Sequence, residues 1–220
     1  MALVRIAIEP TAGPLPANVA RFIGEANARI DRFHATRVKR PLHGFVPSDF
    51  EQAWRTLDAL AKAKLPSGKS FCEWGCGFAA VAGLARLCGY DAAGIEIERD
   101  LLDEARRLTG DFALDVALAL GSFVPQDAGD LAACNEEFSW IVEGGPDGHA
   151  VLRRDPDDFD VVFAYPWPGE EEVIERLFEN FAASDALLVT FHGKEGLRVL
   201  RTVTDLRCLT RRPGDGGLRR

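Results

Sequence analysis

The sequence lacks several features that would place the protein in a membrane, in a secreted class or around a metal ion. It has no apolar run of about 18 residues, the length that a membrane-spanning helix needs. Glu9 and Pro10 interrupt the apolar N-terminal stretch, so it contains no signal-peptide core. The cysteines form no CxxC pair and no local set of four zinc ligands; they are Cys72, Cys76, Cys88, Cys134 and Cys208. We therefore expect a cytoplasmic protein with reduced thiols, no membrane association and no metal site.

Basic residues are also scarce. The 220 residues include 26 Lys and Arg against 34 Asp and Glu, which gives a formal net charge of -8. Because phosphate contacts from Lys and Arg supply most of the affinity for nucleic acid, this balance disfavours nucleic acid as a partner. The hydrophobic content of 47% is sufficient for one sizeable core. We expect one α/β domain that carries an N-terminal extension.

The N-terminal part of the chain has the apolar spacing of helices. Residues 1–15 are broken by Pro and Gly and are expected to be extended. Apolar residues recur at helical spacing over residues 16–39, and again in a second helix that begins near Ser48. Ser48 and Glu51 have the spacing of a capping box, so we expect Ser48 to cap this second helix. The two helices predict a helical extension before the first strand of the main sheet.

From residue 71 onward, short apolar strands alternate with helices. Strands are expected over residues 71–74, 91–98, 115–123 and 185–193, and from residue 159. Helices are expected over residues 77–90, 99–110 and 169–182, and residues 197–212 hold one or two weak strands. This alternation predicts a Rossmann-like, doubly wound, mostly parallel sheet. We divide the chain into a helical extension (1–66), a Rossmann-like domain (67–212) and a tail (213–220).

A glycine-rich turn follows the first of these strands. "GCGFAA", residues 75–80, matches the pattern G-x-G-x-x-[GA] of dinucleotide-binding turns, and Glu96 ends the next strand, where a ribose hydroxyl would be held. These two features fit NAD and S-adenosylmethionine equally. Glu73 separates them, because a carboxylate beside the turn favours a sulfonium or ammonium and disfavours a pyrophosphate. The late start of the first strand also suits a cap over a methyl donor.

The turn and the next strand resemble a known family. "EWGCGF" is similar to the first motif of class I S-adenosylmethionine-dependent methyltransferases, and "GIEIERDLLDEARRL" is similar to their second. The resemblance covers roughly residues 45–195, and "GSF" lies where the family has its adenine contacts. Two positions depart from the family pattern: Ala79 stands where a third glycine is usual, and Ser122 stands where an Asp is frequent.

The resemblance implies a role for each residue of these motifs. Glu73 would hold the amino end of the methionine, directly or through water, and Gly75 and Gly77 would let the chain pass close to S-adenosylmethionine. Glu96 would hold the ribose hydroxyls. The remaining cofactor-binding residues implied are Cys76, between the glycines, Ile97 against the adenine, and the adenine contacts Ser122 and Phe123.

The acceptor side is expected at "YPWP", residues 165–168. Methyltransferases that act on amino groups often have Asn/Asp-Pro-Pro-aromatic at this place, whereas this chain offers the phenol of Tyr165 and the ring of Trp167 as an aromatic wall. The alternative is a rigid loop whose rings pack beneath the N-terminal helices. We expect Tyr165 and His192 to be catalytic, with His192 contacting the substrate or moving a proton, and Tyr165, Trp167 and His43 to bind the substrate.

The sequence therefore predicts a methyltransferase in which a substrate nucleophile attacks the sulfonium methyl in line. The acceptor is a small molecule or a protein side chain, and the protein is a monomer or a homodimer whose interface would use an exposed edge after the weak final strands. Two alternatives stay open. One is a nicotinamide-dependent oxidoreductase that uses the same turn, and the other is a non-catalytic module that binds S-adenosylmethionine.

Overall fold

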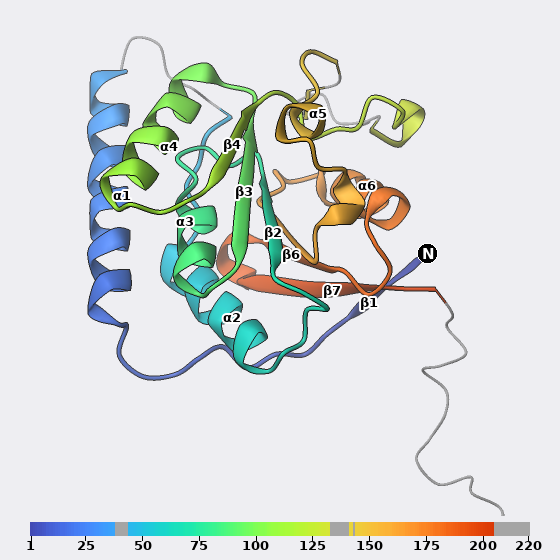
Figure 1. The fold of residues 1–220 in the computed structure, drawn as a ribbon, viewed down its shortest axis with the longest axis horizontal. Coiled ribbons are helices and arrows are strands. Elements are labelled where there is room, and N and C mark those ends of the chain that lie inside the picture. Colours follow the sequence, from blue (N-terminus) through green and yellow to red (C-terminus); the bar gives the residue numbers. More distant parts are fainter. Residues whose placement is uncertain (38–43, 133–140, 143, 205–220) are drawn as a thin grey trace, which may run out of the picture.

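The computed structural model describes residues 1–37, 44–132, 141–142 and 144–204 (Figure 1). One sheet carries all seven strands of this part: β1 (Ala2–Arg5), β2 (Ser70–Trp74), β3 (Asp91–Glu96), β4 (Ala117–Leu120), β5 (Val161–Ala164), β6 (Leu187–Phe191) and β7 (Leu197–Val203). The helices are α1 (Ala17–Thr36), α2 (Phe50–Lys62), α3 (Ala80–Leu87), α4 (Arg99–Asp111), α5 (Gly148–Leu152) and α6 (Glu171–Phe181). The short 3-10 helices are η1 (Gly129–Ala132), η2 (Pro156–Asp158) and η3 (Gly193–Glu195). The predicted α/β class and the mostly parallel sheet are confirmed.

The strand order, β1-β7-β6-β5-β2-β3-β4, creates a switch point beside β2. From β2 the chain winds to β3 and β4 on one side, then returns to place β5 on the other side of β2. Strands β2 to β6 are mutually parallel, so their carboxyl ends lie at one edge of the sheet. Ligands of open α/β sheets bind in the crevice at such a switch point.

The two ends of the described chain meet in the sheet. β7 runs antiparallel to β6, and β1 runs antiparallel to β7. The final strand is therefore an inner strand covered by β1, and the exposed edge that we expected after it is absent from the described part of the chain. The sequence did not reveal this pairing because β1 lies far away in the chain, and local patterns contain no information about a partner nearly 200 residues on.

The predicted boundary at residue 66 stays a prediction, and the sheet extends across it.

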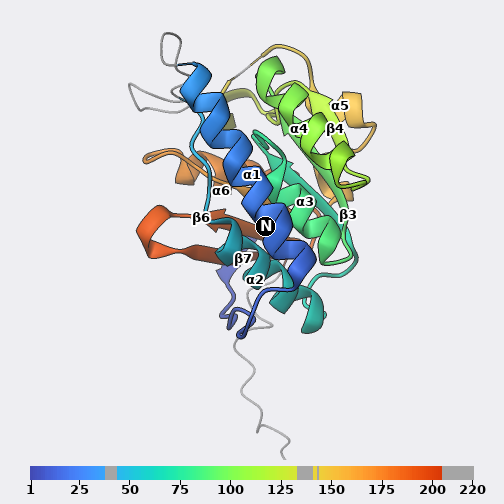
Figure 2. The ribbon, with the colours of Figure 1, turned by 90° about the vertical axis from the view of Figure 1, so that its left-hand side faces the viewer.

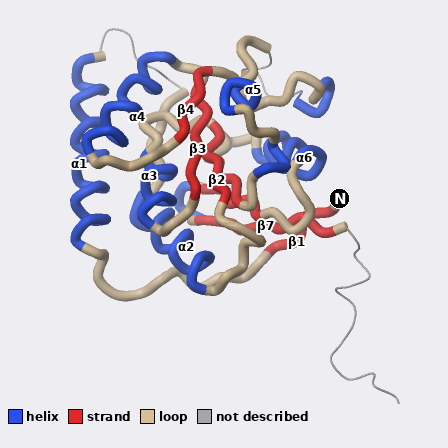
Figure 3. Tube along the Cα trace, viewed as in Figure 1, coloured by secondary structure: helices blue, strands red, loops and turns tan. Residues whose placement is uncertain are grey.

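Helices cover both faces of the sheet. In Figure 1 the helices α1 to α4 lie on one side of the strands and α5 and α6 on the other, and Figure 3 shows the same three layers by secondary structure. Figure 2, turned by a quarter, shows α1 crossing over α3 at the outside of its layer. Each face has its own apolar core, because the central strands are buried on both sides.

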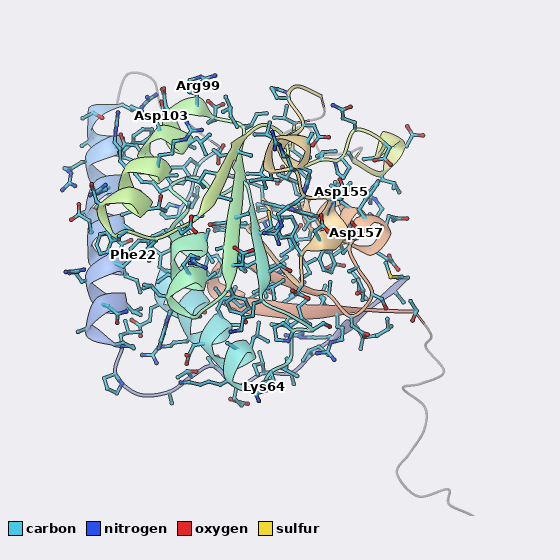
Figure 4. All side chains as sticks on the ribbon, in the orientation of Figure 1. Phe22, Lys64, Arg99, Asp103, Asp155 and Asp157 are labelled. Carbon is cyan, nitrogen blue, oxygen red and sulfur yellow. The ribbon has the colours of Figure 1, made fainter. Side chains whose placement is uncertain are left out.

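Close packing of α1 on α3 depends on a small residue. The ring of Phe22, which is labelled in Figure 4 and fully buried, occupies the space where Gly83 has no side chain. A Cβ atom at Gly83 would collide with that ring. The Ala- and Gly-rich sequence of α3 thus lets a second helix lie directly on it.

The second helix is capped by a different residue from the one predicted. α2 begins at Phe50, and the Oδ1 atom of Asp49 accepts a hydrogen bond of 2.9 Å from the amide of Gln52. Ser48 stands one position too early to reach this amide, which is the third of the helix. The expected Ser48 cap is therefore wrong, and Ser48 instead lines the cavity described below.

Candidate functional site

A cavity of about 300 Å³ lies at the carboxyl ends of β2, β3 and β5. Arg99, labelled in Figure 4 at the start of α4, marks this edge of the sheet next to β3. Of the residues predicted for the site, the cavity is lined by Glu73, Gly75, Cys76, Glu96, Ile97, Ser122, Phe123, Tyr165 and Trp167. Gly77 and His192 are not among its lining residues, and His43 lies outside the described residues. The fold thus brings side chains from four loops of the sequence to one place.

The glycine turn has the backbone geometry that its sequence predicts. Gly75 and Gly77 have φ angles of 68° and 53°, in the left-handed region that favours glycine. A Cβ atom on Gly75 would meet no atom within 4 Å, whereas one on Gly77 would collide with the ring of Phe45. Gly75 therefore leaves room for a ligand, and Gly77 leaves room for the N-terminal loop. Ala79, at the expected third glycine, has the same left-handed conformation, with φ of 52°.

Glu73 is a buried acid at the end of β2. Its Oε2 atom accepts a hydrogen bond of 2.8 Å from the amide of Ala82, in the first turn of α3. The pKa of Glu73 is raised to about 8, mainly by burial and also by the charge of Glu96, while hydrogen bonds from the amides of Ala82 and Val81 oppose the rise. The carboxyl of Glu73 is therefore largely protonated at neutral pH, and a neighbouring cation would favour its ionised form.

Glu96 connects the end of β3 to the glycine turn. Its two oxygen atoms accept hydrogen bonds from the amides of Gly77, at 2.7 Å, and Glu98, at 2.8 Å. Burial raises the pKa of Glu96, and these amides counteract the rise. Each carboxylate oxygen has a second lone pair, so Glu96 can still accept a hydrogen bond from a hydroxyl of a ligand. It both shapes the turn and faces the cavity.

The predicted adenine side is built around Ser122 and Phe123. The hydroxyl of Ser122 donates to the carbonyl of Val142 at 2.7 Å and accepts from the amide of Val124 at 3.0 Å, so it organises the loop. The ring of Phe123 stacks on Trp74, with 5.3 Å between ring centroids and 8° between their planes. The indole N–H of Trp74 is buried and has no hydrogen-bond partner in the described structure. The role of Trp74, which the sequence left open, includes supporting Phe123.

The predicted acceptor side contains one residue that sequence reasoning missed. Tyr165 packs edge-on against Phe191, with ring centroids 4.9 Å apart, and both Tyr165 and Trp167 line the cavity. Glu170, buried at the start of α6, lines it too and accepts hydrogen bonds from the amides of Trp167 and Ile141. The available signal was an acid two residues after "PWP" and immediately before a helix.

His192 is positioned away from this constellation. Its Nε2 atom lies 2.8 Å from the hydroxyl oxygen of Thr190, beyond the end of β6. Burial lowers the pKa of His192, and Arg198 lowers it too. The expected catalytic role of His192 stays a prediction, without support from the lining of the cavity.

Solved structures of other proteins have a similar fold. A methyltransferase from Geobacter sulfurreducens is similar at a TM-score of 0.51 and 17% sequence identity, over 87% of this chain and 93% of that one. The chain therefore has a methyltransferase fold. The likeness in fold is consistent with the resemblance of the motifs around Gly75 and Glu96 to those of class I methyltransferases.

Other methyltransferases are similar at lower scores. An RNA methyltransferase from Salinibacter ruber in complex with S-adenosyl-L-homocysteine has a TM-score of 0.49 at 16% identity, covering 73% of this chain and 96% of that one. An O-methyltransferase from Bacillus cereus, also in complex with this compound, has a TM-score of 0.47 at 13% identity, covering 80% and 66%. No protein-family profile matches the sequence, and no curated protein matches it.

The described residues contain neither a metal-binding cluster of side chains nor a membrane-spanning helix. Within the described residues, no group of three or more His, Cys, Asp or Glu residues is arranged to hold a metal ion. Asp155 and Asp157, labelled in Figure 4, belong to the turn that enters β5, where Asp155 takes part in a capping box of η2. Across the same described ranges, no helix is long and apolar enough to cross a membrane.

Proposed function

We propose that this chain is an S-adenosylmethionine-dependent methyltransferase. The proposal depends mainly on the buried carboxyl of Glu73, which lines the cavity just before the glycine turn of a methyltransferase fold. A carboxyl that is buried beside a cavity is stabilised in its charged form by a cation, and S-adenosylmethionine carries two cationic groups. Gly75 supports the fit, because its missing side chain leaves open space on the cavity side of the turn.

The residues divide into cofactor and acceptor sides. Glu73 would bind the amino end of the methionine, and Glu96 would bind the ribose hydroxyls. Gly75 and Cys76 would lie along the methionine part of S-adenosylmethionine. Ile97, Ser122 and Phe123 would surround the adenine, the last two through backbone and ring contacts, since the Ser122 hydroxyl is already engaged. S-adenosylmethionine, when bound, supplies an electrophilic methyl group.

The protein's contribution to transfer would be alignment and exclusion of water. Tyr165 and Trp167 border the cavity after β5, next to Glu73 on β2. Holding a nucleophile in line with the methyl group accelerates a bimolecular reaction by making it effectively intramolecular. The acceptor is a small molecule or a protein side chain.

A nicotinamide cofactor fits less well. A pyrophosphate at this turn would approach the carboxyl group of Glu73, and the amide of Gly77 is already bonded to Glu96. Both features oppose the usual binding of phosphate by backbone amides at a helix N-terminus. Among the described residues, this turn therefore supports the oxidoreductase alternative less well than it supports a methyltransferase.

Calorimetric titration of the purified chain distinguishes these alternatives. We expect heat of binding with S-adenosylmethionine and with S-adenosylhomocysteine, and none with NADH. Binding of NADH alone would contradict the proposal. The formation of S-adenosylhomocysteine in the presence of a pool of candidate acceptors then separates an enzyme from a non-catalytic module.

A further inference from the structure

The loop that carries the predicted adenine contacts is bonded to the segment that leads into α5. The amide of Ser122 donates to the carbonyl of Pro146 at 2.8 Å, and the amide of Gly148 donates to the carbonyl of Ser122 at 2.9 Å. A Cβ atom at Gly121 would lie 2.5 Å from the carbonyl oxygen of Pro146, so the two segments are in direct contact. The position of this loop therefore depends on α5 as well as on β4, the strand before it.

The first turn of α5 is fixed by its own contacts. The Oδ1 atom of Asp147 caps the helix by accepting hydrogen bonds from the amides of His149, at 2.9 Å, and Ala150, at 3.1 Å. A Cβ atom at Gly148 would collide with the side chain of Ile95 on β3, so this turn lies directly on a central strand. As a result the side chain of His149 points into the protein, where the residue is 2% exposed.

The ring of His149 lies between two backbone carbonyls. Its Nε2 atom is 3.1 Å from the carbonyl oxygen of Phe123, and its Nδ1 atom is 3.3 Å from that of Arg154. Burial lowers the pKa of His149, although the two carbonyls oppose the decrease, so the ring carries one proton at neutral pH. The shorter distance favours this proton on Nε2, which then donates to the carbonyl of Phe123.

The peptide between Phe123 and Val124 is thereby held at both of its polar groups. His149 bonds to its carbonyl, and the hydroxyl of Ser122 accepts from its amide at 3.0 Å. The ring of His149 also packs edge-on against Trp74, with ring centroids 6.3 Å apart, and Trp74 supports the ring of Phe123. One side chain of α5 therefore contacts both the backbone of Phe123 and the ring on which Phe123 stacks.

We propose that His149 is a positioning residue, which holds Phe123 in the conformation that binds the adenine of S-adenosylmethionine. This inference rests on the proposed function. Phe123 lines the cavity, whereas His149 is not among its lining within the described residues, so His149 acts through Phe123. A ring that is already fixed loses less conformational freedom when a base stacks on it. The effect of His149 is therefore confined to the adenine end of the ligand.

The test compares two ligands that differ at this end. S-adenosylhomocysteine and S-ribosylhomocysteine share the homocysteine and ribose parts, but only the first has an adenine. His149→Phe retains a ring against Trp74 and Phe159 and removes the N–H donor. By calorimetric titration, this variant should bind S-adenosylhomocysteine about tenfold more weakly and S-ribosylhomocysteine less than about twofold more weakly. Equal losses for the two ligands, or no loss in a folded variant, would overturn the inference.

A rescue variant separates the hydrogen bond from packing. Glutamine has an amide N–H that can replace the Nε2–H group, so His149→Gln should bind S-adenosylhomocysteine within about threefold of the wild-type chain. Val151→Ala is the matched control, because Val151 lies on the same helix and is 56% exposed. It should leave the binding of both ligands unchanged. A folded His149→Gln chain that binds as weakly as His149→Phe contradicts the role of the hydrogen bond.

A double-variant cycle tests whether His149 acts through Phe123. In a Phe123→Ala chain, the further change His149→Phe should alter the affinity for S-adenosylhomocysteine by less than about twofold. Losses that multiply in the double variant would show that His149 acts independently of Phe123. This cycle uses S-adenosylhomocysteine alone and does not depend on the strength of S-ribosylhomocysteine binding.

A milder variant applies if His149→Phe does not fold. Asp147→Ala removes the cap of α5 at a half-buried position and loosens the same turn. It should weaken S-adenosylhomocysteine more than S-ribosylhomocysteine, and equal losses would again overturn the inference.

The two proposals fail in different ways. Absence of S-adenosylhomocysteine binding by the wild-type chain refutes the methyltransferase function. Binding by the wild-type chain, with equal losses of the two ligands in the variants, refutes only the role of His149.

Discussion

The ionisation of Glu73 links the charge of the site to the stability of the fold. Its carboxyl is buried, accepts a hydrogen bond from an amide in the first turn of α3 and has a pKa that is raised to about 8. Since the unfolded chain ionises near the ordinary pKa of about 4.5, the raised value stabilises the fold at low pH. This contribution is lost as the pH rises through about 8. A bound cation offsets the loss by favouring the ionised form.

The first prediction concerns this linkage. S-adenosylmethionine should bind more tightly as the pH rises from about 6 to about 8, by about tenfold or more, because binding ionises Glu73. Titrations in two buffers of different ionisation enthalpy should detect release of a proton. Glu73→Gln should bind more weakly with little loss of stability and should lack most of this pH dependence. Glu98→Gln, which also changes an acid in the cavity lining but an exposed one, should retain it.

An affinity that does not change with pH, together with an unaltered Glu73→Gln variant, would contradict this account of Glu73. The ligand's own amino group also titrates, so the difference between the two variants is the decisive measurement.

The second prediction separates two glycines that look equivalent in sequence. Gly75→Ala and Gly77→Ala each place a side chain in the left-handed region, at a cost of roughly 1 to 2 kcal/mol. Gly77→Ala should lose more stability, because its Cβ collides with the Phe45 ring. Gly75→Ala, which meets no protein atom, should lose affinity for S-adenosylmethionine beyond its loss of stability. Urea denaturation and calorimetry measure the two effects.

The double variant Gly77→Ala/Phe45→Ala serves as the control for the collision. Its loss of unfolding free energy should be smaller than the sum of the losses in the two single variants, by about 1 kcal/mol or more. Additive losses would show that Phe45 is not the cause.

At the scale of elements, α1 is the part of the N-terminal extension that closes the site. It docks on α3 through Phe22, and Ile30, on a later turn of the same helix, lines the cavity. The loop that follows supplies Phe45, which lies between His34 and Phe78 in a stack of rings. Because α1 has no side-chain cap at its start, tertiary packing supplies much of its stability.

The third prediction tests this docking. Phe22→Ala removes a fully buried ring and should destabilise the protein by about 3 to 5 kcal/mol, since the space that it leaves cannot close completely. Chemical denaturation measures the change. Arg32→Ala, on the same helix with a side chain that is 65% exposed, should cost less than about 1 kcal/mol. Equal effects of the two substitutions would exclude the proposed docking through Phe22.

At the scale of the whole molecule, the sheet has two edges, β1 and β4. β1 is only four residues long and covers the seven-residue strand β7. Short edge strands limit edge-to-edge pairing with other molecules. We therefore expect β1 to protect the sheet from such pairing, at a place separate from the cavity, which lies at the ends of β2, β3 and β5.

The fourth prediction removes this protection. A chain that begins at Ala7 exposes the backbone groups of β7 that pair with β1. It should unfold at a lower temperature and should self-associate at concentrations at which the full chain does not. Sedimentation velocity measures the association, and S-adenosylmethionine binding by the shortened chain shows that the cavity is preserved. A monomeric shortened chain of unchanged stability would contradict the protective role of β1.

The elements that were predictable are those whose information is local. The alternation of strands and helices from Ser70 to Phe191 follows from short buried apolar runs and from helical periodicity. α3 begins at Ala80, later than expected, because Gly75, Gly77 and Ala79 all have left-handed backbone conformations before it. The methyltransferase resemblance rested on this local turn and the acid before it, and the fold is consistent with it.

The sequence predicted less about site residues whose burial and orientation depend on segments far away in the chain. Glu170 was missed because an acid before a helix is ordinary in sequence, and only folding buries it beside the cavity. His192 was favoured for its position after a strand, but its side chain bonds to Thr190 and does not line the cavity. A strand end fixes where a residue lies along an edge, whereas the direction of the side chain depends on the packing around it.

By itself, the sequence determined the alternating elements, the left-handed glycine turn and the acid that precedes it, because propensity, backbone sterics and charge act over a few residues. The tertiary structure decided that β1 closes the sheet beside β7, that Phe45 fills the space above Gly77, and that Glu170 joins the acids of the cavity. These outcomes depend on burial and on contacts between segments far apart in the chain. Such contacts arise only when the whole core forms.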